Sequence, residues 1–252
     1  MALEHIRLHR FNPFRLNIDR CCLCKQGRSV DESLNNKHPS NDSLCHICRD
    51  ILRQQTSTAS CTQCGLPITL NSTGSCGACL TSPPFRRKTL SGALYQFPVD
   101  RMITAFKYNA KLHYLSPLLD QLIDNIHHTY DIAKRPQLLI PIPLHPKKLR
   151  DRGFNQSVLI SKGLSQALNI PVASVLRRTK HTEPQSRLSA KARQRNLTNA
   201  FKITKTGQAT IQGKTLAIID DVITTGTTIE KAAQHLLQAG AREVDAWSLA
   251  RA

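Results

Sequence analysis

Eight of the nine cysteines in this 252-residue chain form four CxxC pairs, and all of them precede residue 80. A CxxC turn directs two thiolates at one tetrahedral centre, so four pairs can supply the ligands of two four-cysteine zinc sites. Disulfides are the weaker interpretation, because the cytosol does not favour them. The expected zinc ligands are Cys21, Cys24, Cys45, Cys48, Cys61, Cys64, Cys76 and Cys79.

Two ways of combining the pairs satisfy tetrahedral geometry, one sequential and one interleaved. We favour the sequential arrangement, because SLCHICRDIL is typical of a zinc knuckle that opens onto a short helix, while CTQCGLP and CGACL have the spacing of a hairpin ribbon. Cys22 and His46 remain, and we interpret both as bystanders. A redox role for one CxxC is the minor alternative, because four pairs together favour metal.

The cysteine-rich segment is poor in large apolar side chains, so core burial alone cannot hold it together and bound zinc is expected to supply its folding energy. Residues 1–85 are therefore predicted to form a small zinc-ribbon module. Residues 86–252 are long enough to form a second domain with a core of its own.

From Leu90 onward, apolar runs alternate with amphipathic stretches, which indicates an α/β fold with a Rossmann-like parallel sheet. Helices are predicted where apolar residues recur at i, i+3, i+4 and i+7. The expected strands are 91–97, 137–144, 214–220 and 243–251, and the expected helices are 99–108, 115–126, 154–169 and 226–240.

The segment 216–228, LAIIDDVITTGTT, joins an apolar strand to a Thr/Gly turn at the start of a helix. Backbone N–H groups in the first turn of a helix lack partners within the helix and lie at the positive end of its dipole. They can therefore bind a phosphate dianion, and Gly226 permits a close approach of the backbone.

Asp220 and Asp221 end the strand that precedes this turn. Two carboxylates there can accept hydrogen bonds from vicinal ribose hydroxyls, directly or through Mg2+, so the segment is predicted to bind a 5-phosphoribosyl group. A simple N-capping turn would not explain the acid pair. The chain has neither a GxxxxGK[ST] P-loop nor a GxGxxG dinucleotide fingerprint.

The chain is strongly basic, with 35 Lys and Arg against 17 Asp and Glu and a formal net charge of +18. The basic residues gather in 146–154 and 177–195, which favours a polyanionic partner over charges scattered on a solvated surface. Apolar runs are short and the N-terminus carries Arg and His, so we expect a cytoplasmic protein without a signal peptide or membrane insertion.

The sequence IIDDVITTGTT resembles the phosphoribosyl pyrophosphate (PRPP) signature of type I phosphoribosyltransferases. The four CxxC pairs, then PIPLHPKKLRDRGFNQS, then RRTKHTEPQSRLSAKARQRNLTNAF, and finally this signature resemble the ComF family of the ComFC/GntX type. The same order of these motifs over nearly the full length makes the resemblance specific. It implies a type I phosphoribosyltransferase fold behind an N-terminal zinc module.

The resemblance implies roles for individual residues. Asp220 and Asp221 would be the catalytic pair that holds the ribose hydroxyls and Mg2+. The 5-phosphate would bind to Thr224, Thr225, Gly226, Thr227 and Thr228, and the pyrophosphate to Lys147, Lys148, Arg150 and Arg152 in the loop after 137–144. Residues 177–199 would be a mobile flap, with a solvated linker as the alternative.

The family is associated with uptake of single-stranded DNA in natural transformation, so the resemblance implies a competence protein that binds single-stranded DNA and PRPP, with a competence helicase or another uptake protein as partner. Phe106, Tyr108 and Phe154 are candidates for base stacking. The residues expected to contact DNA phosphates are Arg150, Arg152, Arg177, Arg178, Lys191, Arg193 and Arg195.

Two other functions stay open at this stage. The chain could be an active phosphoribosyltransferase, a pentosyl-transferring glycosyltransferase, acting on an unidentified base, or a PRPP-sensing interaction module. Only about two dozen residues follow the signature, so the usual base-recognition region is reduced to 243–252. Trp247 lies there, and we expect it to belong to the core more than to stack on a base.

Overall fold

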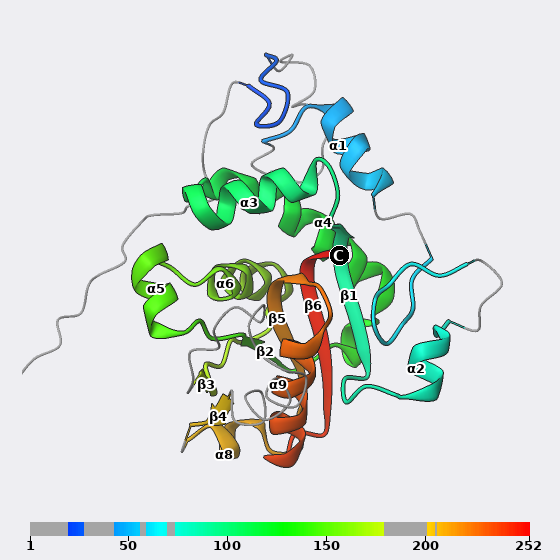
Figure 1. Cartoon of the computed structure of the whole chain (residues 1–252), viewed down its shortest axis with the longest axis vertical. Helices are drawn as coiled ribbons and strands as arrows, with labels where there is room; N and C mark the ends of the chain where they lie inside the picture. The colour runs from blue at the N-terminus through cyan, green and yellow to red at the C-terminus, as the bar shows by residue number, and fades with distance from the viewer. Residues whose placement is uncertain (1–19, 28–42, 56–58, 70–73, 179–200, 205) are drawn as a thin grey trace, which may run out of the picture.

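The computed structural model describes residues 20–27, 43–55, 59–69, 74–178, 201–204 and 206–252 (Figure 1). Two cysteine-rich segments lie against an α/β domain. Within the described residues, no helix is long and apolar enough to cross a membrane.

Four parallel strands form the central sheet in the order β1-β6-β5-β2. They are β1 (Lys88–Leu94), β2 (Leu138–Pro141), β5 (Thr215–Ile223) and β6 (Glu243–Arg251). The register places Ile140 opposite Ile218, and Ile218 opposite Ala246. All four strands predicted from the apolar runs are confirmed, with shifted ends, and so is the parallel α/β class.

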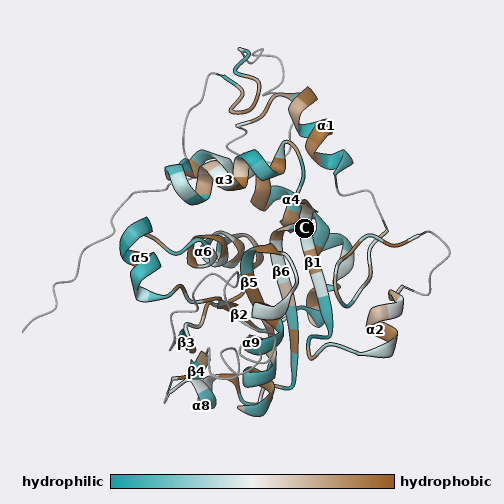
Figure 2. Ribbon diagram, in the orientation of Figure 1, coloured by the Kyte–Doolittle hydropathy of each residue, from teal (hydrophilic) through white to brown (hydrophobic). Residues whose placement is uncertain are grey.

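The two faces of the sheet bury alternate residues of β5, as pleating requires. Ala217 and Ile219 face a core shared with α3 (Val99–Asn109), α4 (Leu115–Thr129) and α6 (Gln156–Leu168). Leu216 and Ile218 face a second core under α9 (Thr227–Gln238). The four predicted helices are thereby confirmed, and Figure 2 shows hydrophilic and hydrophobic residues alternating along α3 and α9.

The remaining elements are short. They are α1 (His46–Gln54), α2 (Gly77–Thr81), α5 (Pro146–Arg152), α8 (Gly207–Ile211), the 3-10 turns η2 (Leu112–Tyr114) and η3 (Ile132–Lys134), and the antiparallel pair β3 (Leu176–Arg178) and β4 (Phe201–Ile203). Most of the expected flap, residues 179–200, lies outside the described residues.

The basic segment after β2 forms helix α5, where we had expected a loop. Pro146 stands in its first turn, where a missing N–H costs nothing, and the His145 ring accepts a hydrogen bond from the Lys147 N–H at 3.2 Å. Gly153 ends the helix with φ 78°. The helix therefore depends on its two caps, because within α5 no residue is buried.

Both cysteine-rich segments pack directly on the α/β domain. Cys21, Leu44 and Leu52 belong to the core that lies under α3 and α4. On the other side, the Thr89 N–H of β1 donates to the Thr62 carbonyl at 2.8 Å. The domain boundary predicted near residue 85 stays a prediction. These contacts join the cysteine-rich segments before it to the sheet and helices after it.

Candidate functional site

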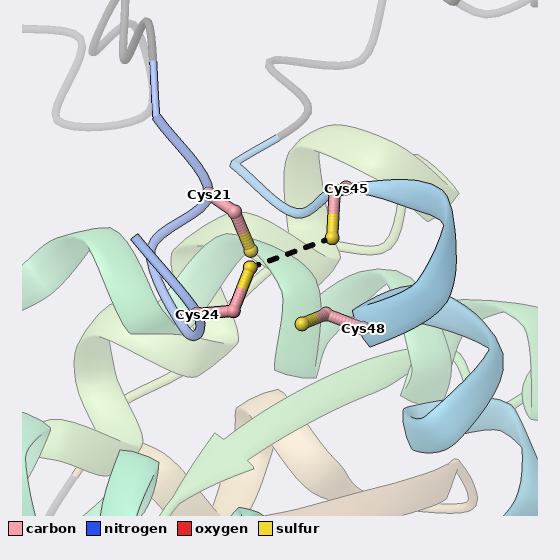
Figure 3. Close-up of side chains that lie close together, drawn as sticks. All are labelled: Cys21, Cys24, Cys45 and Cys48. Carbon is pink, nitrogen blue, oxygen red and sulfur yellow. Dashed lines mark hydrogen bonds between the residues drawn. The ribbon is translucent and has the colours of Figure 1, made fainter. Parts of the chain in front are cut away.

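The structure gathers the eight paired thiols into two clusters, in the sequential arrangement. In each cluster the four sulfurs lie within 4.8 Å of one another. Figure 3 shows the first cluster, where Cys24 Sγ and Cys45 Sγ are 3.7 Å apart. The clusters are Cys21, Cys24, Cys45 and Cys48, and Cys61, Cys64, Cys76 and Cys79. Each could hold a zinc ion.

The two clusters repeat one local structure. The first CxxC lies in a turn closed by an isolated antiparallel bridge, Arg20 with Gly27 in one segment and Ser60 with Pro67 in the other. The residue after each turn has a positive φ, 65° at Lys25 and 72° at Gly65. The second CxxC begins helix α1 or α2. The cysteine spacing did not indicate this repeat of backbone geometry.

The titration of the thiols fits a metal site. Burial raises the pKa of Cys21, but backbone N–H donors outweigh it and bring the pKa to about 6, and Cys61 shows the same balance. Burial and the neighbouring thiols raise the pKa of Cys48 and Cys79. Four converging sulfurs that oppose one another's ionisation are stabilised by a bound cation.

The two spare residues of the first segment lie outside the sulfur clusters. Burial raises the pKa of the Cys22 thiol to about 11, so this thiol is a poor ligand while it stays protonated. His46 is exposed at the start of α1. This placement agrees with our interpretation of both as bystanders.

The acid pair lies in the last part of β5, which continues to Ile223, and its two members have different partners. Asp220 Oδ1 accepts hydrogen bonds from Ser157 Oγ at 3.2 Å and from the Asp221 N–H at 2.9 Å. Asp221 Oδ1 accepts from the Val222 N–H at 2.7 Å and forms an ion pair with Lys107 Nζ at 2.9 Å. Ser157 and Lys107 were not found by sequence reasoning.

Burial raises the pKa of Asp220 to about 7, with the adjacent charge of Asp221 as the second cause. Hydrogen bonds from the Asp221 N–H and Ser157 and the positive charge of Lys107 act in the opposite direction. The pair therefore changes its charge near neutral pH. Perturbed carboxyls of this kind are common at functional sites.

The turn after the acids is shaped as an anion site. Gly226 adopts φ 76° at the N-cap of α9, a conformation that favours glycine. The hydroxyls of Thr225 and Thr227 are 2.9 Å apart, and the Thr227 N–H lies 3.4 Å from Thr225 Oγ1. The N–H groups of the first turn of α9 therefore follow the acid pair closely along the chain, at the positive end of the helix dipole.

Cations from three elements gather beside the acids. Partial desolvation lowers the pKa of Lys148 on α5, and the charges of Arg178, Arg152 and Lys107 lower it further. The pKa of Arg178 on β3 is lowered by burial and raised in part by Asp220. The cations of α3, α5 and β3 therefore act on one another and on the acid pair.

A buried amide beside these cations has an unsatisfied donor. Gln156, which is 1% exposed at the start of α6, accepts a hydrogen bond from Arg152 through Oε1 at 3.0 Å, while its Nε2 has no partner within the described structure. The Arg152 guanidinium also lies over the Tyr108 ring, 5.1 Å from its centroid. A buried N–H donor next to cations suits an anionic oxygen.

Some residues expected to contact nucleic acid are placed and others are not. Arg150 and Arg177 are exposed, whereas Lys191, Arg193 and Arg195 lie outside the described residues. The expectation that Phe106 stacks on bases is wrong, because its side chain is fully buried and packs against Phe154.

Tyr108 remains available at the surface with 68% of its side chain exposed. Trp247 is fully buried and donates to the Tyr130 hydroxyl at 3.3 Å, as expected of a core residue.

The chain is similar in sequence to known proteins. The family described as "Phosphoribosyl transferase domain" matches residues 155–252, which include the acid pair and the turn. The DNA utilization protein YhgH of Escherichia coli O157:H7 is 36% identical over 211 residues, 82% of this chain and 90% of its own length. Competence protein F of Haemophilus influenzae is 34% identical over 221 residues, 86% of this chain and 94% of its own length.

Among solved structures, a purine phosphoribosyltransferase from Pyrococcus horikoshii Ot3 matches with a TM-score of 0.32 and 19% sequence identity. The match covers 65% of this chain and 78% of that one.

Proposed function

Since the chain belongs to the ComF family of competence and DNA utilization proteins, we propose that it binds PRPP with Mg2+ and single-stranded DNA during DNA uptake. The observation that supports this proposal is the convergence of an acid pair, an anion-binding turn and a group of cations at the carboxyl end of β5.

Each part of PRPP has a counterpart in this site. The 5-phosphate fits the N–H groups and hydroxyls of residues 224–228, as at other helix N-termini. The ribose hydroxyls fit Asp220 and Asp221. The pyrophosphate fits the side of Arg152 and Gln156, where a buried amide donor is unsatisfied and cations gather.

Mg2+ would neutralise pyrophosphate charge when it binds, and carboxylates are the ligands it prefers. Asp220 and Asp221 are the residues that would hold it. In the ligand-free chain, Lys107 already balances Asp221 through its 2.9 Å ion pair. When Mg2+ binds, the Lys107 ammonium either turns to the pyrophosphate or stays on the acid pair. In both cases its positive charge remains at the site.

Binding of single-stranded DNA is supported by the charge of the chain and by its relatives' names. The excess of 18 positive charges favours a polyanion, and Arg150 and Arg177 are exposed on α5 and β3. Tyr108 adds an exposed ring next to Arg152, a combination suited to stacking on a base.

Calorimetric titration with PRPP, with and without Mg2+ and a single-stranded oligonucleotide, tests the proposal. We expect Mg2+-dependent binding that is lost in Asp220→Ala plus Asp221→Ala. Wild-type affinity in this double variant would show that the acids are not part of the site.

Retardation of oligonucleotides tests the DNA part separately. We expect Arg150→Ala plus Arg152→Ala to weaken retardation, and retardation by the wild type to fall steeply with salt. Lys162→Ala, on the exposed side of α6, is the matched control. Unchanged retardation in the double variant would place the DNA on another surface.

An active phosphoribosyltransferase is the second candidate, favoured by the complete acid pair beside a cationic group that suits a leaving pyrophosphate. Release of pyrophosphate from PRPP with a panel of bases tests it. Binding without release under any of these conditions would favour the PRPP-sensing alternative.

A further inference from the structure

Arg251, near the end of β6, joins the phosphate loop (residues 223–228) to the second cysteine cluster. Its side chain is 4% exposed. Its Nη1 donates to the Ile223 carbonyl at 2.8 Å and also to the Thr224 carbonyl, while its Nε donates to the Cys64 carbonyl at 2.8 Å. One buried guanidinium therefore contacts both the phosphate loop and a residue of the cluster.

Arg86 makes a second connection, behind Gly226. It is 6% exposed and forms an ion pair with Glu230 in the first turn of α9, at 2.5 Å. A Cβ placed on Gly226 would lie 3.3 Å from Arg86 Nη2, so the guanidinium is in direct contact with the loop. Arg86 Nε also donates to Thr89 Oγ1 at 2.9 Å.

Both connections end at the turn 61–65, which carries the first CxxC of the second cluster. Thr89, the partner of Arg86, donates its hydroxyl proton to the Gln63 carbonyl at 2.6 Å and its N–H to the Thr62 carbonyl at 2.8 Å. Gly65 is packed so closely that an added Cβ would lie 2.9 Å from Thr89 Cγ2.

The turn 61–65 has little apolar packing to hold it. The buried residues of its hydrophobic cluster are cysteines alone, with Ile68 and Cys76 partly buried against them. A metal ion bound by the four thiols would therefore supply most of its order. Without that order, Arg251 and Thr89 lose the carbonyls of Cys64, Gln63 and Thr62 as partners.

We infer that Arg251 and Arg86 are positioning residues that make the phosphate loop depend on an ordered second cluster. The affinity of the phosphate loop for phosphate rests on the proposed function. The dependence of the loop's conformation on Cys61, Cys64, Cys76 and Cys79 does not. In the described structure, the first cluster has no equivalent connection, because its segment contacts α3, α4 and Tyr114.

Hydrogen–deuterium exchange of residues 222–232 in the full chain tests this dependence without any ligand. Cys76→Ser and Cys24→Ser each remove one thiol from a close pair, one in each cluster. We expect Cys76→Ser to increase exchange about tenfold, and Cys24→Ser to change it less than about twofold. Equal exchange rates of residues 222–232 in both variants would overturn the inference. So would an exchange rate in Cys76→Ser that does not exceed that of the wild type.

Binding of ribose 5-phosphate tests the two arginines. We expect Arg251→Lys and Arg86→Lys to weaken binding about tenfold while the zinc content stays unchanged. Arg87→Lys is the matched control, because Arg87 bonds to Asp245 and Glu243 and not to the loop.

Wild-type affinity in Arg251→Lys and Arg86→Lys would overturn the inference. If one of them fails to fold, the other carries the test. If the wild type does not bind ribose 5-phosphate at all, the proposed ligand is wrong, and the exchange experiment still decides whether the cluster orders the loop.

Discussion

Adjacent carboxylates near the end of β5 are held in unlike ways. Asp220 accepts hydrogen bonds from Ser157 and from the Asp221 N–H, whereas Asp221 forms an ion pair with Lys107. Burial is the main reason that the pKa of Asp220 rises to about 7. The Asp220 carboxyl, next to the phosphate loop, is therefore costly to ionise in the folded state. The stability of the fold depends on pH for this reason.

Replacing Asp220 with Asn should stabilise the ligand-free protein above neutral pH. The folded-state pKa of about 7 lies above the ordinary value of 3.8, so the folded protein binds the proton more tightly than the unfolded chain. Stability then falls as pH rises from about 3.8 to about 7 and is level above that. We expect Asp220→Asn to raise the free energy of unfolding by on the order of 1–2 kcal/mol at high pH.

Urea unfolding at two pH values, one below the ordinary value of 3.8 and one above 7, measures this effect. The gain should be small at the lower pH, where the carboxyl is largely protonated in the unfolded chain as well as in the folded protein. Asp124→Asn on exposed α4 surface is the control. An equal gain at both pH values would show that the titration of Asp220 is not its cause.

Replacing Lys107 with Met should destabilise the protein, because Asp221 would then stay buried without a counter-charge. A loss of about 1–3 kcal/mol in the free energy of unfolding is expected above neutral pH, and added Mg2+ should restore part of it. Lys111→Met, at an exposed position, should have little effect. Unchanged stability in Lys107→Met would rule out this role of the ion pair.

The acids could be located from the sequence, but their partners could not. Asp220 and Asp221 stand close to a strand end, which local patterning identifies. Ser157 belongs to α6, and Lys107 to α3, far from the acids along the chain. Their proximity depends on how those helices pack on the sheet, and no local signal records it.

At the scale of elements, the phosphate loop joins β5 to α9, and its conformation depends on Gly226. We expect Gly226→Ala to cost about 1–2 kcal/mol in stability because of its positive φ, and also to weaken binding of ribose 5-phosphate because the new Cβ presses on Arg86.

Gly213 provides a matched control for this prediction. It has a φ of 68°, close to that of Gly226, but nothing lies within 4 Å of an added Cβ. Gly213→Ala should therefore show a similar loss of stability with unchanged phosphate affinity. If both variants bind equally well, contact between Gly226 and Arg86 does not shape the loop. Urea unfolding and calorimetry give the two readouts.

The long elements were predictable because burial imposes a period on their side chains. Helix α5 was missed because it has no buried face, although Pro146 and Gly153 mark its ends. The pair β3 and β4 was missed because each strand has three residues and the two lie far apart in the sequence. Short elements held by caps or by distant partners leave little periodic signal.

At the scale of the whole molecule, the first cysteine cluster and the α/β domain share one core. Cys21 and Cys48 belong to the same buried set as Phe106, Leu122 and Trp247. The sequence suggested a separate module because the cysteine spacing is local, whereas the packing of the cluster on α3 and α4 is not. Metal bound there would stabilise more than the cysteine-rich segment.

Removing metal should therefore affect the whole chain. Metal analysis is expected to give about two zinc ions per chain, one for each four-cysteine cluster. Chelation should lower the melting temperature, with coincident changes in circular dichroism and in the fluorescence of Trp247, the sole tryptophan.

Two outcomes would contradict this prediction. Zinc near zero in a folded, reduced preparation would show that the clusters do not bind it. Separate transitions for Trp247 and for the secondary structure would show that the cysteine-rich segments unfold independently of the sheet.

The sheet order has a consequence for how the chain folds as it leaves the ribosome. In the four-stranded sheet, β1 pairs with β6 alone, although some 150 residues separate them in the sequence. Until β6 is synthesised, β1 has no neighbouring strand in this sheet, and the apolar faces of α3 and α4 lack Trp247 and Leu249 as packing partners. Nascent chains of this protein should therefore need protection from aggregation until β6 has been synthesised.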